Sequence, residues 1–139
     1  MARIDTLELD FRAIVDVVIA ETELTTSRKW GVVQARRTMA EQEKIYAQGR
    51  TAPGEIVSNA PPGSSAHNYG EAVDLCPMKG TEFDWKAPDD LFHIMADIAE
   101  KHGLVAGYYF KSITDKPHIE SATWRERRAL WKAGKLTIS

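Results

Sequence analysis

Apolar residues recur with the spacing of one helical face in two long stretches of the chain. The first stretch predicts a helix over residues 6–20, with Asp5 and Glu8 at the spacing of a capping box. The second predicts a helix over residues 88–102, which Gly103 closes. The apolar positions of the two faces are Leu7, Phe11, Ile14, Val15, Val18, Leu91, Phe92, Met95, Ile98 and Ala99.

Two shorter helices are predicted from their end signals and composition. Thr38 and Glu41 form a second capping box, which opens a helix over residues 38–48 that Gly49 closes. A terminal helix is expected over residues 124–132.

Short strands are predicted between these helices, at residues 30–36, 71–76, 104–110 and 117–121. The strand at 71–76 alternates apolar and polar residues and is expected to stop at Pro77. Turn-forming residues predict a loop over 50–66. Helices that flank a small, antiparallel sheet predict an α+β fold, and the length predicts a single domain over residues 1–139.

The composition narrows the class of protein. A net charge of -2 gives no basis for nucleic-acid binding, which calls for a strongly basic domain. No apolar stretch reaches the roughly 18 residues of a membrane span, and the single cysteine, Cys76, excludes an internal disulfide. The first residues lack the apolar run of a signal peptide, so we expect synthesis in the cytoplasm. Separately, we expect the protein to be a monomer.

Three residues are candidates for metal ligands. His67 lies in a loop just before the strand that carries Asp74, and Gly70 lets the backbone turn between them. His118 lies at a strand start, after Pro117. Two histidines and one carboxylate leave a fourth coordination position open, which is the arrangement of catalytic rather than structural zinc. Other divalent ions also suit such a set.

Asp115 precedes His118 by three residues, close enough to take a proton from a water at the open position. Taken alone, however, Asp115-Lys116-Pro117 also fits a turn with an Asx-type hydrogen bond. The spacing therefore leaves a base and a turn former as alternatives at Asp115.

The combined pattern resembles the zinc peptidases of peptidoglycan, a family that contains D-Ala-D-Ala carboxypeptidases and dipeptidases and the L-alanyl-D-glutamate endopeptidases of phage endolysins. The resemblance rests on SAHNYGEAVD at 65–74, DKPHIE at 115–120 and ARRTMAEQ at 35–42. IVSNA at 56–60 and HNYG at 67–70 are most similar to the endolysin-type members.

The resemblance implies that His67, Asp74 and His118 bind Zn²⁺ and that Asp115 is the general base. It also implies that Arg37 holds a substrate carboxylate or stabilises the oxyanion, whereas the neighbouring Arg36 points away to the surface. Its fold would be that of the D-Ala-D-Ala peptidases and hedgehog-type domains.

Three further positions have open roles. Ser65 either binds substrate or turns the loop, and Glu120 either orients a metal ligand or forms a structural salt bridge. Many family members carry a Gly/Trp-rich segment before the Asp-x-x-His motif, but here Tyr and Phe occupy 108–110. The wall of the substrate site is therefore the part that the resemblance defines least.

We expect a zinc peptidase that cleaves an amide bond of the peptidoglycan stem peptide, the L-alanyl-D-glutamate bond before others. The resemblance suggests a phage endolysin that is held in the host cytoplasm and acts on the cell wall after release. The alternatives are a D-Ala-D-Ala carboxypeptidase, a zinc-stabilised binding module of the hedgehog type, and a domain whose motif matches are accidental.

Overall fold

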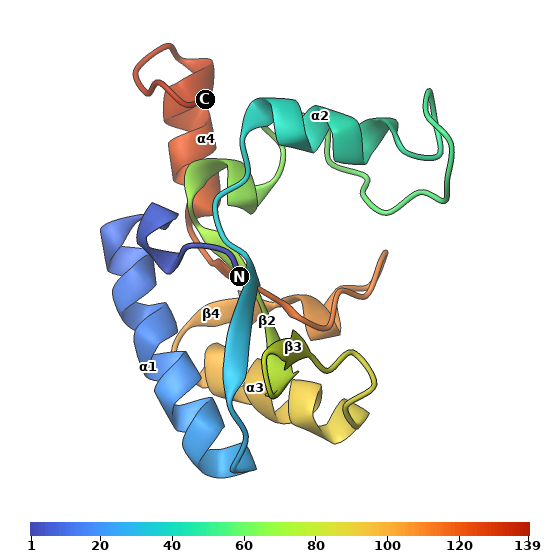
Figure 1. Ribbon diagram of the computed structural model, residues 1–139. Helices are drawn as coiled ribbons and strands as arrows, with labels where there is room; N and C mark the ends of the chain where they lie inside the picture. Colours follow the sequence, from blue (N-terminus) through green and yellow to red (C-terminus); the bar gives the residue numbers. More distant parts are fainter.

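The centre of the molecule is an antiparallel sheet, seen in a computed structural model that describes residues 1–139 (Figure 1). Its strands follow the order β1-β2-β5-β4, and a short β3 pairs with the far end of β2. The strand bounds are Trp30–Gln34 for β1, Ala72–Lys79 for β2, Glu82–Phe83 for β3, Leu104–Ala106 for β4 and His118–Ser121 for β5. The predicted α+β class with a small antiparallel sheet is confirmed.

Two helices, α1 (Leu9–Thr26) and α3 (Asp89–Lys101), lie side by side and build the main core with the sheet (Figure 1). Helices α2 (Met39–Ala47) and α4 (Trp124–Lys132) lie at the other end of the molecule. A smaller core there joins α4 to the 3₁₀ helix η2 (Ala66–Tyr69). The molecule therefore has a helix-backed sheet and, above it, a second layer that carries η2.

Helix α1 begins and ends later than the sequence predicted. Its N-cap is Glu8, whose carboxylate accepts hydrogen bonds from the first-turn amides, so the expected capping box with Asp5 is wrong. Asp5 instead pairs with Arg3. The helix continues to Thr26 because its last turns pack against the rest of the molecule: Thr22 is fully buried, and Glu21 pairs with Lys101 and His102 at the end of α3.

Strand β2 continues through Pro77, where the sequence predicted a stop. The Met78 amide donates to the Lys29 carbonyl oxygen on the β1 side, so the nitrogen of Pro77 faces the opposite edge. On that edge the Pro77 carbonyl oxygen still accepts from the Asp84 amide. The proline therefore costs the strand one donor only, and pairing with β3 continues beyond it.

The other boundaries follow the predictions with two changes. The capping box at Thr38 is present and Gly49 follows the end of α2 with a left-handed φ of 81°. Strand β1 ends at Gln34, at a bulge, and the predicted strand over 104–110 divides into β4 and a 3₁₀ helix, η3 (Gly107–Tyr109). No helix of the structure is long and apolar enough to cross a membrane.

Candidate metal centre

Strand pairing places two of the predicted ligands opposite each other. In the register of β2 and β5, Asp74 is the direct partner of His118, and Ala72 is the partner of Glu120. Directly paired residues of antiparallel strands project to the same side of the sheet. Two ligands separated by 44 residues are thus brought together by regular backbone pairing.

The third ligand, His67, is placed by the short helix η2. Ser65 caps this helix, since its hydroxyl accepts from the His67 amide. Gly70 ends it with a left-handed φ of 68°, which turns the chain into β2. The Arg37 amide donates to the His67 carbonyl oxygen, so the segment after β1 also holds the turn.

The three side chains converge on one point. His67 Nε2 lies 3.2 Å from His118 Nδ1 and 3.3 Å from Asp74 Oδ1, and the last two atoms are 3.1 Å apart. Ligand atoms at about 2.0–2.1 Å from a tetrahedral zinc lie about 3.3 Å from one another. The spacing and the N/N/O donor set therefore fit a single zinc ion.

Hydrogen bonds fix which ring nitrogen of each histidine points to this centre. His67 Nδ1 donates to the Ala35 carbonyl oxygen at 2.7 Å, which leaves Nε2 free for metal. His118 Nε2 donates to Glu120 Oε1 at 2.7 Å, which leaves Nδ1 free. Trp124 Nε1 donates in turn to Glu120 Oε2 at 2.7 Å. Glu120 therefore fixes the orientation of the His118 ring, so that Nδ1 points to the candidate centre.

Charges at the centre are strongly coupled. Although burial by itself raises the pKa of the Asp74 carboxyl, the facing His67 and His118 hold it well below its usual range. Burial lowers the pKa of His118, but hydrogen bonds with Asp74 and Glu120 outweigh it and raise that pKa to about 10 when no metal is bound. His118 would therefore have to lose a proton before its Nδ1 could bind a metal ion.

Asp115 lies beside the ligands without being one of them. Its Oδ2 is 3.8 Å from His118 Nδ1, and its side chain is half-exposed. Partial burial raises the pKa of the Asp115 carboxyl, and the neighbouring Asp74 raises it further. Its amide donates to the Gly107 carbonyl oxygen, and a Cβ at Gly107 would lie 2.3 Å from the Asp115 carbonyl oxygen. The position of Asp115 therefore depends on glycine in η3.

Arg37 lines the same cavity, of about 320 Å³, as the three ligands and Asp115. Burial lowers the pKa of its guanidinium, while the nearby carboxylates oppose that effect. One Nη donates to Gln42 Oε1 at 2.9 Å, whereas Nε is buried without a hydrogen-bond partner. Arg36 turns away and bonds to Ser139, as expected of a surface residue.

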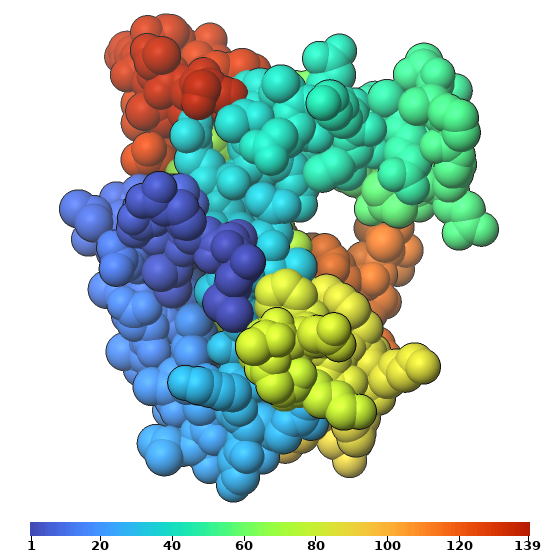
Figure 2. All heavy atoms as spheres, viewed as in Figure 1, coloured from blue at the N-terminus to red at the C-terminus, as the bar shows by residue number.

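A groove leads away from the centre between the loop at 57–64 and the segment at 110–115. Residues of both segments line a cavity of about 510 Å³, which includes Asp115. Figure 2 shows the molecule hollowed between the α2–loop region and the segments below it. Ser65 lines the cavity of the metal centre and the adjoining one, while its hydroxyl also caps η2, so both expected roles fit its position.

The segment at 108–110, whose role the sequence left open, divides between two tasks. Tyr108 and Tyr109 point to α3, where their hydroxyls donate to Asp89 and Asp97. Phe110 instead lines the groove, with its ring centre 5.6 Å from that of His118. Of these three aromatic side chains, Phe110 is the one that lines the groove.

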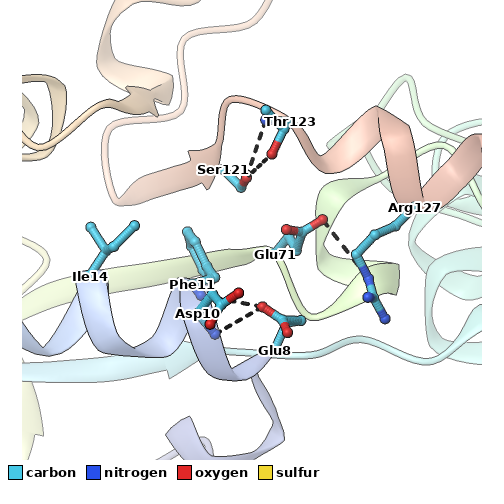
Figure 3. A pocket seen from close by; sticks show the side chains of 8 residues that line it. All are labelled: Glu8, Asp10, Phe11, Ile14, Glu71, Ser121, Thr123 and Arg127. Carbon is cyan, nitrogen blue, oxygen red and sulfur yellow. Dashed lines mark hydrogen bonds and ion pairs between the residues drawn. The ribbon is translucent and has the colours of Figure 1, made fainter.

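A second polar cavity, of about 290 Å³, lies near the start of α1, and none of the predicted site residues lines it (Figure 3). Burial raises the pKa of its central carboxyl, Glu71, whose Oε2 lies 4.0 Å from Arg127 Nε. The carboxylates of Glu8 and Asp10 complete its acidic side. It holds no cluster of metal-ligating atoms, so the His67 centre is the candidate site.

Three contributors to the site were missed in the sequence. Gln42 is fully buried and links Arg37 to the Ala60 carbonyl oxygen of the loop. Trp124 donates to Glu120, and Gly107 makes room for Asp115. Only the spacing of Trp124, four residues after Glu120, hinted at contact.

Comparison with known proteins gives a consistent result. Residues 58–121 match the sequence profile of the D-alanyl-D-alanine carboxypeptidase family. The peptidoglycan L-alanyl-D-glutamate endopeptidase CwlK of Bacillus subtilis is 34% identical over 98 residues, which are 64% of this chain and 58% of that protein. The chain thus spans little more than half the length of this relative.

Solved structures share the fold. The L-Ala D-Glu endopeptidase ChiX of Serratia marcescens superposes with a TM-score of 0.62 at 19% identity, covering 90% of this chain and 86% of ChiX. The vancomycin-resistance D,D-pentapeptidase VanY, in complex with Zn(II), gives a TM-score of 0.61 at 13% identity, covering 92% and 79%. The resemblance found in the sequence is confirmed: residues 58–121 carry the pattern of the D-alanyl-D-alanine carboxypeptidase family, on the fold of these peptidases.

Proposed function

We propose that this chain is a zinc peptidase that cleaves the L-alanyl-D-glutamate bond of peptidoglycan stem peptides. The observation that carries the proposal is the convergence of His67, Asp74 and His118 beside a carboxylate, Asp115, that is not itself in the ligand cluster. A site that only stabilised a fold with zinc would have no need of a free carboxylate at its edge.

The choice of bond is supported by two of the similar proteins. CwlK and ChiX are both named as L-alanyl-D-glutamate endopeptidases. The family profile itself carries the name of D-alanyl-D-alanine carboxypeptidase, which keeps that activity as the second candidate.

In the proposed reaction, the three ligands hold zinc and Asp115 transfers a proton. Zinc held by the three ligands would polarise the scissile carbonyl and lower the pKa of a water to about 7. Asp115, raised in pKa by partial burial, takes a proton from the attacking water and later gives it to the leaving nitrogen. Its half-exposed carboxylate faces the groove, so a peptide in the groove lies within its reach.

Arg37 stabilises negative charge on the substrate. Its guanidinium lines the cavity of the ligands and keeps one buried N–H without a partner in the chain. A buried donor of this kind gains most when an oxyanion or carboxylate occupies the cavity. Gln42 holds the guanidinium from behind and prevents it from turning to solvent.

We further propose that the protein acts as a phage endolysin, present in the host cytoplasm until it reaches the wall. The support is the resemblance of residues 56–60 and 67–70 to endolysin-type members. Its partner is then the peptidoglycan stem peptide, which it meets as a monomer.

The test is digestion of purified peptidoglycan with zinc-loaded protein, followed by mass spectrometry of the released peptides. New stem peptides that begin with D-glutamate are expected, and a chelator should prevent their release. Loss of terminal D-alanine alone would identify a carboxypeptidase. No cleavage by folded, zinc-loaded protein would favour the binding module.

A further inference from the structure

An unpaired guanidinium stands where two cavities of the groove meet. Arg125, in the first turn of α4, lines the cavity of about 510 Å³ that contains Asp115. It also lines a cavity of about 310 Å³ that contains His118 and Glu120. The two cavities share Phe110, so they form one continuous groove, and Arg125 lies within it beside the metal centre.

The Arg125 guanidinium has no hydrogen bond or ion pair with any other residue of the chain. Its one specific contact is with the ring of Trp124, whose centre lies 4.6 Å from the Arg125 Cζ. Two other arginines illustrate the contrast: Arg28 pairs with Asp84 at 3.0 Å, and Arg37 bonds to Gln42. Arg125 therefore keeps all of its donors for a molecule in the groove.

The Trp124 ring, which lies beneath the Arg125 guanidinium, is linked by hydrogen bonds to the metal centre. Trp124 is buried, stacks on Tyr69, and donates through Nε1 to Glu120, which accepts from the ligand His118 with its other oxygen. Each oxygen of Glu120 thus has a partner of its own, and neither bonds to Arg125. The linked side chains of His118, Glu120 and Trp124 thus connect Arg125 to the candidate metal centre.

We propose that Arg125 determines specificity by binding a carboxylate of the stem peptide. This inference rests on the proposed peptidase function and names the feature of the substrate that it selects. The planar guanidinium offers paired N–H donors that match the two oxygens of a carboxylate, whereas a carboxamide offers only one acceptor oxygen. The groove then has two cationic points, Arg37 within the cavity of the ligands and Arg125 farther along. Stems with free carboxylates are preferred over their amidated forms.

The test compares zinc-loaded wild type with Arg125→Ala, Arg125→Lys and Lys132→Ala. Lys132 is the matched control, because it is an exposed cation of the same helix and lines no cavity of the groove. The probes are a synthetic tetrapeptide stem with free carboxylates and versions in which each carboxylate in turn is a carboxamide. Cleavage is followed by chromatography to obtain kcat and KM separately.

Wild type and Lys132→Ala should show a KM about 10- to 100-fold lower for the free acid than for one of the amides, as expected for hydrogen bonds to a charged group. Arg125→Ala should lose that preference, with its KM for the acid rising to the amide value and kcat little changed. Arg125→Lys should restore part of it. Equal loss on acid and amide in Arg125→Ala, or no change at all, would overturn the assignment.

A binding measurement distinguishes failure of this inference from failure of the proposed function. Calorimetry with the Asp115→Ala variant, loaded with zinc, measures affinity for the acid and the amides without turnover. If this variant binds the acid more tightly than the amides, and the added Arg125→Ala substitution abolishes the difference, the inference is supported. That holds even if wild type cleaves no stem peptide, because the lack of cleavage would overturn only the proposed function. Cleavage without any preference for the acid would overturn the inference alone.

Discussion

The two halves of the site are held in different ways. Asp74 and His118 stand opposite each other on paired strands, and His67 is fixed by a capped turn and a bond to the Ala35 carbonyl oxygen. Asp115 lies on an irregular segment, and it faces a loop across the groove. The candidate metal ligands are thus held by paired strands and a capped turn, while the proposed substrate groove is lined largely by loops.

This difference suggests that metal binding and substrate binding depend on separate parts of the site. Strand pairing and the capped turn of η2 together keep three donor atoms within 3.3 Å of one another, the precision that a metal site needs. The groove has one aromatic wall, Phe110, and one cation without a partner in the chain, Arg125, and neither belongs to the ligand cluster. Substitutions in the first half should abolish metal binding, and those in the second should spare it.

The largest effect is expected from His118→Ala. Loss of one of three ligands, and of the bond that Glu120 makes, should remove stoichiometric zinc and reduce peptidoglycan cleavage to background. Zinc content of the purified protein and turnover are the measurements. His93→Ala is the control, because the His93 side chain is exposed on the outer face of α3 and pairs with Asp97. Retention of one tightly bound zinc by His118→Ala would contradict the ligand assignment.

Asp115→Ala should lower turnover without affecting metal binding, and so distinguish the two halves of the site. General acid–base groups contribute about 10²- to 10⁴-fold to rate, so kcat should fall by that factor while zinc content and thermal unfolding stay near wild type. Turnover and metal content of the same preparation provide the comparison. Unchanged turnover would show that Asp115 is only a turn former.

Gly107→Ala should lower turnover by displacing Asp115, and zinc content must be measured alongside because the added Cβ would also lie 3.0 Å from His118 Cβ. The added Cβ would lie 2.3 Å from the Asp115 carbonyl oxygen, so the backbone that carries the carboxylate must move. Displacement of a reacting group by about 1 Å can cost about 10²-fold in rate. Gly80→Ala is the control, since it carries the strain of a positive φ but meets no atom within 4 Å. Equal kinetics of the two variants would rule out this positioning role.

The smallest expected effect is the release of a proton from His118 when zinc binds. When no metal is bound, the pKa of His118 is raised to about 10, so this residue carries a proton at pH 8 that zinc must displace. Calorimetry in buffers of different ionisation enthalpy should show about one proton released per zinc at pH 8, and affinity should rise with pH up to about 10. Glu120→Gln should diminish the release, because it removes a carboxylate that raises this pKa. Binding without proton release at pH 8 would contradict the coupling.

The same protonated His118 affects the stability of the metal-free protein. Because the pKa in the folded state lies above that of an unfolded histidine, the stabilisation is complete below about pH 6.5. It is lost as pH rises through about 10. The unfolding temperature of metal-free protein should therefore fall across this range.

Much of the ligand half could be predicted from the sequence. Alternation along residues 71–76 identified the strand of Asp74, and Pro117 marked the start of the strand of His118. Local signals cannot show, however, that the two strands pair in the register that places Asp74 opposite His118. The roles of the ligands in catalysis stay a prediction until they are measured.

The groove half was much less predictable, for physical reasons. Nothing local reveals that Gly107 leaves space for Asp115, because the two meet through a fold of the chain eight positions apart. Local sequence also does not reveal that Arg125 lies in the groove, because its place there depends on Trp124 and Glu120. The late start of α1 had a similar cause, because a Glu8 side chain can cap the helix that Asp5 was expected to open.

The central claim is that one metal ion, held by His67, Asp74 and His118, makes this groove a peptidase. The most direct test is to titrate metal-free protein with zinc while measuring bound zinc and release of stem peptides from peptidoglycan in the same samples. Turnover should rise in proportion to bound zinc and level off at one equivalent. Full turnover in the metal-free protein, or one equivalent of bound zinc with no turnover, would contradict the account.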